Sequence, residues 1–389
     1  MLDFSNTEIA FQYKSSKDLK KAYWLFKIIG YNWLIKIGPS LLNITLKLHL
    51  PVLGIIKNTV YRQFCGGETI KECEGVINTL GKYNVKTILD YSVEGKEEET
   101  EFDKNVEQVL ATINKAKENP NIPFSVFKPT GFARFSLLEK VNAHKKLSVD
   151  EEKEFERVVN RIDKMCRYAY ESGVPIFIDA EESWIQDAID NIALQMMKKY
   201  NKEKAVVYNT AQMYRVDRLA YLKEILAEAE KENFYVGMKL VRGAYMEKER
   251  ERAEKLGYES PIQPNKEATD RDFDLALKFC IQHYNRFAIC CGTHNENSSM
   301  LLTQLIAENN IAKEDDKVYF AQLYGMSDHI SFNLAQNGYN VAKYVPYGPV
   351  KDVIPYLIRR AQENTSVAGQ QSRELYLIKK ELQRRKQNQ

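Results

Sequence analysis

Eight short runs rich in β-branched and aromatic residues recur between residues 85 and 345, and a charged helical stretch follows most of them. Most of the runs are continuously apolar rather than alternating, which is typical of strands buried on both faces of a parallel sheet. Strand and helix alternating in this way predict an α/β fold, the (β/α)8 barrel. The runs cover residues 85–90, 123–128, 174–179, 205–209, 235–241, 287–292, 317–321 and 341–345.

The chain outside this repeat has a different character. Residues 1–84 predict a helical extension, residues 85–370 the barrel, and residues 371–389 a basic C-terminal helix or tail. In (β/α)8 barrels the chemistry lies where the strands end, because side chains there point into the mouth of the barrel. We therefore expect the functional residues in the polar clusters that follow the eight runs.

Composition argues against several classes of protein. The net charge of +3 and the absence of an arginine-rich block argue against nucleic-acid binding. The six cysteines show no CxxC spacing, and no second histidine stands at ligand spacing from His294, so no metal site is predicted. The amino terminus has an early acidic residue and no apolar core like that of a signal peptide, which indicates an intracellular protein.

Residues 23–56 form a strongly apolar stretch that lysines and prolines interrupt. No run in it reaches the roughly 18 apolar residues that a membrane-spanning helix needs. Four lysines stand just upstream, between residues 14 and 21. Two interpretations stay open: basic amphipathic helices on an anionic membrane surface, or helices packed against the barrel.

Two adjacent arginines, Arg359 and Arg360, stand in the helical stretch after the last run, and Glu363 follows one turn later. Arginine presents a planar fork that can pair with a carboxylate or a phosphate through two hydrogen bonds. Glu363 is spaced to hold either guanidinium in place. An exposed salt bridge within the helix is the alternative interpretation.

Lys128 would add a third cation, because it ends the second run. Glu94 and Asp179 supply negative charge after the first and third runs. Clustered cations and carboxylates suit a zwitterionic ligand, and Tyr344 offers a flat face to cover an aliphatic ring or chain.

The segment KLVRGAY, residues 239–245, ends a run with a basic residue, two small residues and an aromatic one. Gly243 and Ala244 lack bulk, so a large planar group such as a flavin or a nucleotide could approach the backbone closely. An ordinary strand-to-helix turn explains the same residues.

Nine motifs occur in an order that a known enzyme family shares. They are ILDYSVE (88–94), FKPTG (127–131), FIDAEES (177–183), NTAQMY (209–214), KLVRGAYMEKER (239–250), THN (293–295), QLYGMSD (322–328), YVPYGP (344–349) and YLIRRAQEN (356–364). Together they resemble proline dehydrogenase. The stretch before residue 85 also resembles the helical extension of the monofunctional, mitochondrial-type branch of that family.

The resemblance implies an FAD-dependent barrel that oxidises L-proline to Δ1-pyrroline-5-carboxylate, the first step of proline catabolism. It implies that electrons pass from the reduced flavin to a membrane quinone. The expected location is the cytoplasm, with peripheral attachment to the inner face of the cell membrane, or the matrix side of a mitochondrial membrane in a eukaryote.

The resemblance also assigns roles to residues. The substrate carboxylate would be held by Arg359, Arg360 and Lys128, while Tyr344 would pack on the pyrrolidine ring. Glu94 would pair with Arg359, and Glu363 would steady both arginines. The catalytic assignments are Asp179, an orienting or proton-relaying group, and Lys239, which stands where many bacterial relatives have an arginine beside the reactive flavin nitrogen. The cofactor would lie along Ala180, Gln212, Val241, Arg242, Gly243, Ala244, Lys266, Thr293 and His294.

Three other functions compete with this one. Hydroxyproline dehydrogenase is the nearest, although the resemblance associates that preference with loss of the ring-facing tyrosine, so Tyr344 favours proline. A Schiff-base aldolase on the same barrel would use Lys128 or Lys239. A non-catalytic scaffold at the membrane would use residues 14–56.

Overall fold

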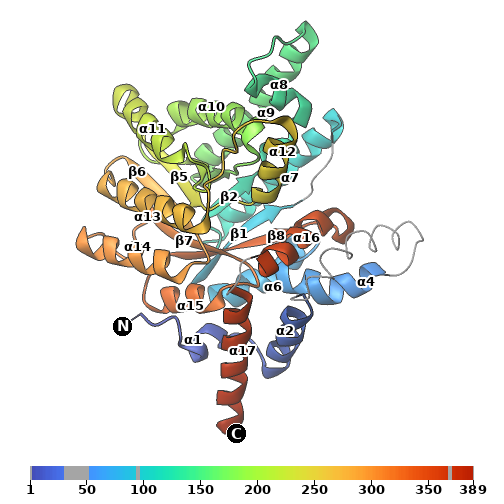
Figure 1. Cartoon of the computed structure of the whole chain (residues 1–389), viewed down its shortest axis with the longest axis vertical. Coiled ribbons are helices and arrows are strands. Elements are labelled where there is room, and N and C mark those ends of the chain that lie inside the picture. Colours follow the sequence, from blue (N-terminus) through green and yellow to red (C-terminus); the bar gives the residue numbers. More distant parts are fainter. Residues whose placement is uncertain (1, 30–51, 93–96, 367–369, 389) are drawn as a thin grey trace. The chain divides into compact units, whose positions relative to one another are not determined.

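Eight parallel strands close into a barrel in the computed structural model, which describes residues 2–29, 52–92, 97–366 and 370–388, with side chains at 2–29, 53–92, 97–360 and 373–388. The strands follow one another around the barrel in sequence order, and Figure 1 shows them with the helices that alternate with them. The predicted (β/α)8 fold is therefore confirmed. The strands are β1 (Val85–Tyr91), β2 (Phe124–Phe127), β3 (Ile176–Ile178), β4 (Val207–Gln212), β5 (Val236–Val241), β6 (Phe287–Gly292), β7 (Val318–Leu323) and β8 (Val341–Tyr347).

The strands form where the apolar runs predicted them because both of their faces are covered. Every residue of β2, β3, β4 and β8 is buried. The third run is longer than its strand: pairing stops at Ile178, so Asp179 begins the loop at the carboxyl end. The fourth strand instead extends past the predicted run to Gln212, which pairs in register with Val241 of β5.

The chain divides into two compact units, one of residues 95–321 and one of residues 1–94 with 322–389. In the first unit, α9 begins with a capping box in which Ser148 and Glu151 satisfy each other's backbone N–H groups, and it ends on Gly173 at φ 68°. The helices of this unit are α7 (Glu99–Glu118), the 3-10 turn η2 (Pro129–Gly131), α8 (Phe135–Asn142), α9 (Val149–Ser172), α10 (Ser183–Tyr200), α11 (Arg218–Glu232), α12 (Met246–Leu256), α13 (Lys266–Gln282) and α14 (Glu296–Glu308).

The second unit joins both ends of the chain. Its C-terminal helix α17 contacts α1 and α2, and the three lie together in Figure 1. The helices here are α1 (Thr7–Phe11), α2 (Ser16–Ile29), α4 (Val52–Ile56), the π-helical turn η1 (Lys57–Tyr61), α5 (Arg62–Phe64), α6 (Ile70–Gly81), α15 (Asp328–Gln336), α16 (Val350–Ser366) and α17 (Gln370–Gln387).

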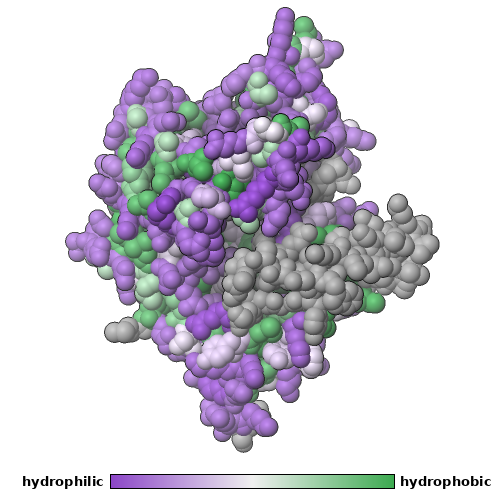
Figure 2. Space-filling view, viewed as in Figure 1, coloured by the Kyte–Doolittle hydropathy of each residue, from purple (hydrophilic) through white to green (hydrophobic). Residues whose placement is uncertain are grey.

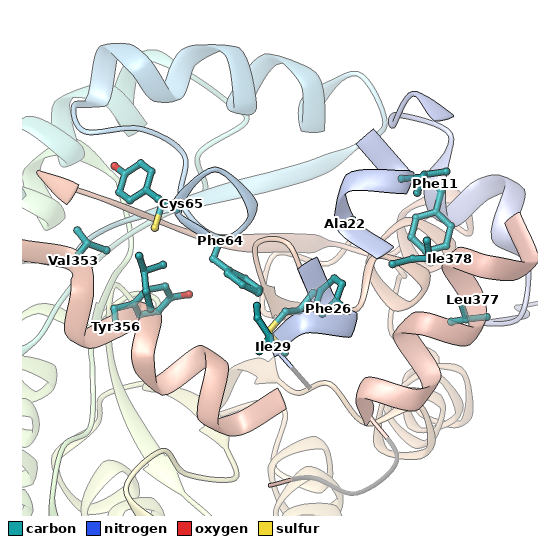
Figure 3. Packing of buried hydrophobic residues seen from close by; sticks show 14 of the residues in the cluster. Phe11, Ala22, Phe26, Ile29, Phe64, Cys65, Val353, Tyr356, Leu377 and Ile378 are labelled. Atoms are coloured by element: carbon teal, nitrogen blue, oxygen red, sulfur yellow. The ribbon is translucent and has the colours of Figure 1, made fainter. Parts of the chain in front are cut away.

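An apolar cluster holds these terminal helices together (Figure 3). Phe26 of α2 meets Phe64 of α5 edge-to-face, with ring centroids 6.1 Å apart. Tyr356 and Val353 of α16, with Leu377 and Ile378 of α17, belong to the same buried cluster. The burial of large aromatic side chains makes the amino-terminal helices part of a core rather than an appendage.

Helix α2 has two different faces. Leu19, Ala22 and Phe26 are buried, whereas Trp24 and Ile28 are exposed by 58% and 49%. The part of the 23–56 stretch between residues 30 and 51 lies outside the described residues. Among the helices that the structure describes, none is long and apolar enough to cross a membrane. The domain boundaries at 84 and 370 stay a prediction.

One face of the protein is mostly polar. On the face shown in Figure 2, hydrophilic residues predominate and apolar ones are interspersed among them. All six cysteines are buried and unbridged, and burial raises the pKa of the Cys290 thiol to about 12, so that thiol is protonated at neutral pH.

Candidate active site

Two predicted catalytic residues contact each other in the unit of residues 95–321. The Lys239 ammonium of β5 donates a hydrogen bond to the Asp179 carboxylate, which follows β3. Their side chains are only 6% and 12% exposed. The backbone N–H of Asp179 also donates to Phe127 O at 2.9 Å, which fixes the loop to β2. Because β3 and β5 flank β4, side chains at their ends reach across one strand to form the pair.

This buried pair is a polar group in an apolar setting. The Lys239 nitrogen lies 5.4 Å from the centroid of the Phe177 ring, close enough for a cation–π contact. A buried ammonium and a buried carboxylate stabilise each other's charged forms, since either one alone would carry a large desolvation cost.

Cations and hydroxyl groups converge after β5 and β6. The guanidinium of Arg242 donates through Nη1 to Thr293 Oγ1 at 2.6 Å, and through Nε to Asp270 Oδ1 at 2.6 Å. Lys266, at the start of α13, donates to the other oxygen of Asp270. The structure therefore brings two predicted cofactor residues, Arg242 and Lys266, together on the Asp270 carboxylate, and Arg242 joins Thr293 to them. Cations with hydroxyls form a donor set that suits an anionic phosphate.

The turn after β5 is held by Gln212, another predicted cofactor residue. Its Oε1 accepts the backbone N–H of Ala244 at 3.2 Å, and its Nε2 donates to Glu181 O at 2.6 Å. The loops after β3, β4 and β5 are thereby connected. Val241 pairs with Gln212 in the sheet, Ala180 stands beside Glu181, and His294 is half-buried after β6.

Gly243 owes its lack of a side chain to a protein contact that the sequence does not reveal. Its φ is 137°, and an added Cβ would lie 2.5 Å from Cγ of Tyr214. The backbone N–H of Tyr214 donates to Arg242 O at 2.7 Å, so the ring is fixed beside the turn. The space that the sequence assigned to a planar ligand at Gly243 is next to this ring, and any ligand would share it with Tyr214.

Glu181 is a buried acid that the sequence analysis left out of the site. Its two carboxyl oxygens accept hydrogen bonds from the backbone N–H and the hydroxyl of Thr130, at 2.8 and 2.7 Å. Burial, with the neighbouring Glu182 adding to it, raises the pKa of Glu181 to about 7. Its place two residues after Asp179, at the same strand end, was the available signal. Lys128 begins the short turn that carries Thr130, and its charge acts on Glu181.

The remaining predicted substrate residues belong to the other unit. Tyr344 lies on β8 with 8% of its surface exposed, and its carbonyl accepts the N–H of Tyr324 at 2.8 Å. Arg360 of α16 is 6% exposed, and its guanidinium carbon lies 5.1 Å from the centroid of the Tyr356 ring. Arg359 is half-buried. A fully exposed salt bridge therefore does not describe Arg360.

Two of the predicted acids cannot be placed. Glu94 lies outside the described residues, and so does the side chain of Glu363. Their pairing with the arginines stays a prediction. Among the described residues, no group of three or more histidines, cysteines or carboxylates is arranged to hold a metal ion.

The fold and these strand-end clusters define a class: a (β/α)8-barrel enzyme with polar chemistry at the carboxyl ends of its strands. The family model for proline dehydrogenase matches residues 73–373. The chain therefore belongs to the proline dehydrogenase family and is an oxidoreductase.

Individual relatives agree with this family. Proline dehydrogenase 1, mitochondrial, from Dictyostelium discoideum is 36% identical over 418 residues, which cover 96% of this chain and 73% of that protein. The hydroxyproline dehydrogenase of Xenopus laevis is 30% identical over 426 residues, with 100% of this chain and 91% of that protein covered. Among solved structures, proline utilization A from Bdellovibrio bacteriovorus aligns with a TM-score of 0.73 at 20% identity, covering 92% of this chain and 38% of that one.

Proposed function

We propose that this protein oxidises L-proline to Δ1-pyrroline-5-carboxylate with FAD as its cofactor, in the first step of proline catabolism. The family membership supports proline as the substrate. The observation that carries the proposal is the buried contact between Lys239 and Asp179 at the ends of β5 and β3. A buried carboxylate beside an ammonium can orient the amine of the substrate or accept its proton, which suits a reaction that removes a hydride and a proton.

The residues around Arg242 fit the cofactor. Arg242, Lys266 and Thr293 would hold its phosphates, and Gln212, Ala180, Val241, Gly243, Ala244 and His294 would line it. When bound, FAD supplies the acceptor for the hydride that leaves the ring carbon next to the nitrogen, while a carbon–nitrogen double bond forms in the substrate. Lys239 would donate a hydrogen bond to the flavin. A single ammonium cannot provide the two parallel hydrogen bonds that an arginine guanidinium provides.

The substrate would be oriented by its carboxylate. Arg359, Arg360 and Lys128 would bind this group, and Tyr344 would cover the ring. Positioning of a reactant against its partner is worth about 7–11 kcal/mol when the reacting atoms are aligned. Asp179 would orient the substrate nitrogen or accept its proton, because the amine must be neutral before the hydride leaves. No residue is expected to form a covalent intermediate.

Flavin absorbance tests the cofactor and the substrate in one experiment. The purified protein should be yellow, and its visible band should bleach on anaerobic addition of L-proline and return with a quinone analogue as acceptor. Trans-4-hydroxy-L-proline, added separately, should bleach it more slowly. A colourless protein, or a band that L-proline leaves intact, would refute the proposal.

Hydroxyproline oxidation is the second candidate, because the Xenopus hydroxyproline dehydrogenase is similar along the whole chain. Tyr344 counts against it, since the resemblance links that substrate to the loss of the tyrosine. The aldolase alternative requires a nucleophilic lysine, and Lys239 is already hydrogen-bonded to Asp179. Borohydride in the presence of substrate would attach a label to such a lysine; an unlabelled protein excludes it.

A membrane quinone as electron acceptor would place the protein at a membrane, on the cytoplasmic face of the cell membrane or on the matrix side in a mitochondrion, as the name of the Dictyostelium relative suggests for that protein. Trp24 and Ile28 on the exposed face of α2, with Lys27 4.9 Å above the Trp24 ring, would contact the lipid. Sedimentation with anionic vesicles should weaken in Trp24→Ala but not in Leu256→Ala, whose side chain is 58% exposed on α12. Equal sedimentation would contradict the attachment.

A further inference from the structure

Asp270 connects the two cations that would bind the cofactor phosphates. One of its oxygens accepts from Arg242 Nε at 2.6 Å and the other from Lys266 Nζ. Arg242 comes from the loop after β5, whereas Lys266 and Asp270 stand one turn apart in α13. The carboxylate therefore joins the loop after β5 to helix α13 through two charged hydrogen bonds.

The orientation of Arg242 is fixed because each of its three guanidinium nitrogens donates a hydrogen bond, and the Asp270 bridge is one of the three. Nη1 donates to Thr293, and Nη2 donates to Ser298 Oγ at 3.0 Å. The guanidinium carbon lies 4.4 Å from the centroid of the Phe273 ring. With Asp270 on the third side, the group is held in one plane. The side chain is still 22% exposed, so its remaining N–H donors can meet a ligand.

The charge state of Asp270 suits this role. Burial alone would raise its pKa, but Lys266 and Arg242 hold the pKa of Asp270 below its ordinary value. The carboxylate is ionised at neutral pH and offsets the repulsion between the two cations. Without this carboxylate, Arg242 and Lys266 would repel each other in the absence of a bound anion.

We propose that Asp270 is a positioning residue for cofactor binding: it holds Arg242 and Lys266 together for the diphosphate of FAD. The inference rests on the FAD dependence proposed above. The direction in which loss of the carboxylate changes FAD affinity tests this inference. Simple charge repulsion between Asp270 and a phosphate predicts that removal of the carboxylate tightens cofactor binding, whereas positioning predicts that it weakens binding.

The test compares charge removal at two positions of the same helix. Asp270→Asn removes the bridge, and Glu267→Gln removes an equal charge from an exposed residue in the first turn of α13. The dissociation constant of FAD is measured by flavin fluorescence on serial dilution of each purified holoenzyme. We expect it to rise by roughly tenfold or more in Asp270→Asn, by analogy with residues that orient metal-ligating side chains, and to stay within about twofold in Glu267→Gln.

A double-mutant cycle separates positioning from a general structural effect. Because Asp270 acts through Lys266, its loss should matter less once Lys266 is gone, so Lys266→Met and Asp270→Asn should be less than additive in their effect on FAD binding. Full additivity would overturn the inference, and so would unchanged or tighter binding in Asp270→Asn.

Three further results are informative. If Asp270→Asn does not fold, Asp270→Glu decides, because it keeps the charge and moves the carboxylate: weaker FAD binding supports positioning, and equal binding overturns it. Wild-type protein that binds no FAD would refute the proposed flavin dependence together with this inference. Wild-type protein that binds FAD as tightly as Asp270→Asn does would refute the inference alone.

Discussion

Asp328→Asn is the most severe single change that the structure suggests. Asp328, at the start of α15, is paired with Lys343 of β8 at 2.9 Å and with Lys14 at 2.8 Å. Tyr13 donates its hydroxyl to the same carboxylate at 2.8 Å. The side chains of Lys343 and Asp328 are 0% and 3% exposed, so the change leaves a cation buried without its carboxylate. The backbone carbonyl of Met326 stays as a hydrogen-bond acceptor for Lys343 but carries no charge.

The expected cost follows from this burial. Removal of one partner from a buried ion pair destabilises a protein by about 3–5 kcal/mol, because the remaining charge is uncompensated. That range lowers the equilibrium constant for folding by between two and four orders of magnitude. Lys14 adds little to the cost, since its side chain is 14% exposed and can turn to water. Replacement of both partners, as in Asp328→Leu with Lys343→Met, should recover most of the loss, because neither charge of the pair then remains buried.

The pH dependence of stability gives an independent check that the buried charge of Lys343 causes the loss in Asp328→Asn. Burial lowers the pKa of Lys343, and Asp328 opposes that shift, so the pKa falls further in Asp328→Asn. Between the folded and the unfolded pKa of Lys343, the unfolded chain binds more protons, and stability rises with pH. The difference in stability between the variant and the wild type should therefore narrow toward alkaline pH. On the acid side, Lys14 and Lys343 hold the pKa of Asp328 well below its usual value despite its burial, so the wild type loses this stabilisation as pH falls below about 4.

Urea unfolding followed by tryptophan fluorescence measures the effect. The matched control is Asp103→Asn, which breaks an ion pair with Arg161 in which Asp103 is 70% exposed, and it should change stability by no more than about 1 kcal/mol. The reasoning fails if Asp328→Asn costs as little as the control, or if the single variant and the double variant are equally unstable. A cost that is the same at pH 7 and at pH 10 would contradict the attribution to Lys343.

Three further variants test the site. Arg360→Met should raise the Michaelis constant for proline by roughly tenfold or more in steady-state assays, because a buried cation for the substrate carboxylate is lost; unchanged kinetics would refute its role. Tyr344→Ser should increase the ratio of kcat/KM for hydroxyproline to that for proline, and a constant ratio would count against ring packing. Glu181→Gln removes an acid whose pKa rises from 4.5 to about 7 on folding, so the wild type loses stability as pH rises across that interval. The free energy of unfolding, measured with urea at pH 5 and at pH 8, should therefore change in favour of Glu181→Gln relative to the wild type at the higher pH. The same difference between the two proteins at both pH values would exclude the assigned pKa.

The barrel could be predicted from the sequence because its pattern is local. Apolar runs bounded by polar clusters encode strands buried on both faces, and Gly173 encodes the end of α9 through its positive φ. The packing of the amino-terminal helices was not predictable in the same way. Phe26 and Phe64 look like residues of an amphipathic surface helix until α16 and α17 are brought beside them from the far end of the chain.

The site was predictable at the level of residue type and strand end, but not at the level of partners. Asp179 and Lys239 were both assigned, yet their direct contact depends on the register of three strands. Asp270 was missed because it stands inside a helix, where an aspartate four residues after a lysine is common on surfaces. Gly243 was assigned to a ligand, and the sequence did not reveal that the ring of Tyr214 lies beside it. Each difference comes from a contact between segments far apart in the sequence.

Two buried lysines of this protein differ in their surroundings. Lys343 and Lys239 are both buried on strands, and each has an aspartate as its counterion. The side chain of Lys343 is fully buried, which favours a structural role for its pair with Asp328. The side chain of Lys239 is 6% exposed, two residues before the carboxyl end of β5, and its pair with Asp179 joins opposite charges. It can therefore offer a hydrogen bond or a proton without attracting an anion from a distance, and the attraction of a substrate carboxylate must come from other cations, with Arg360 as the buried candidate.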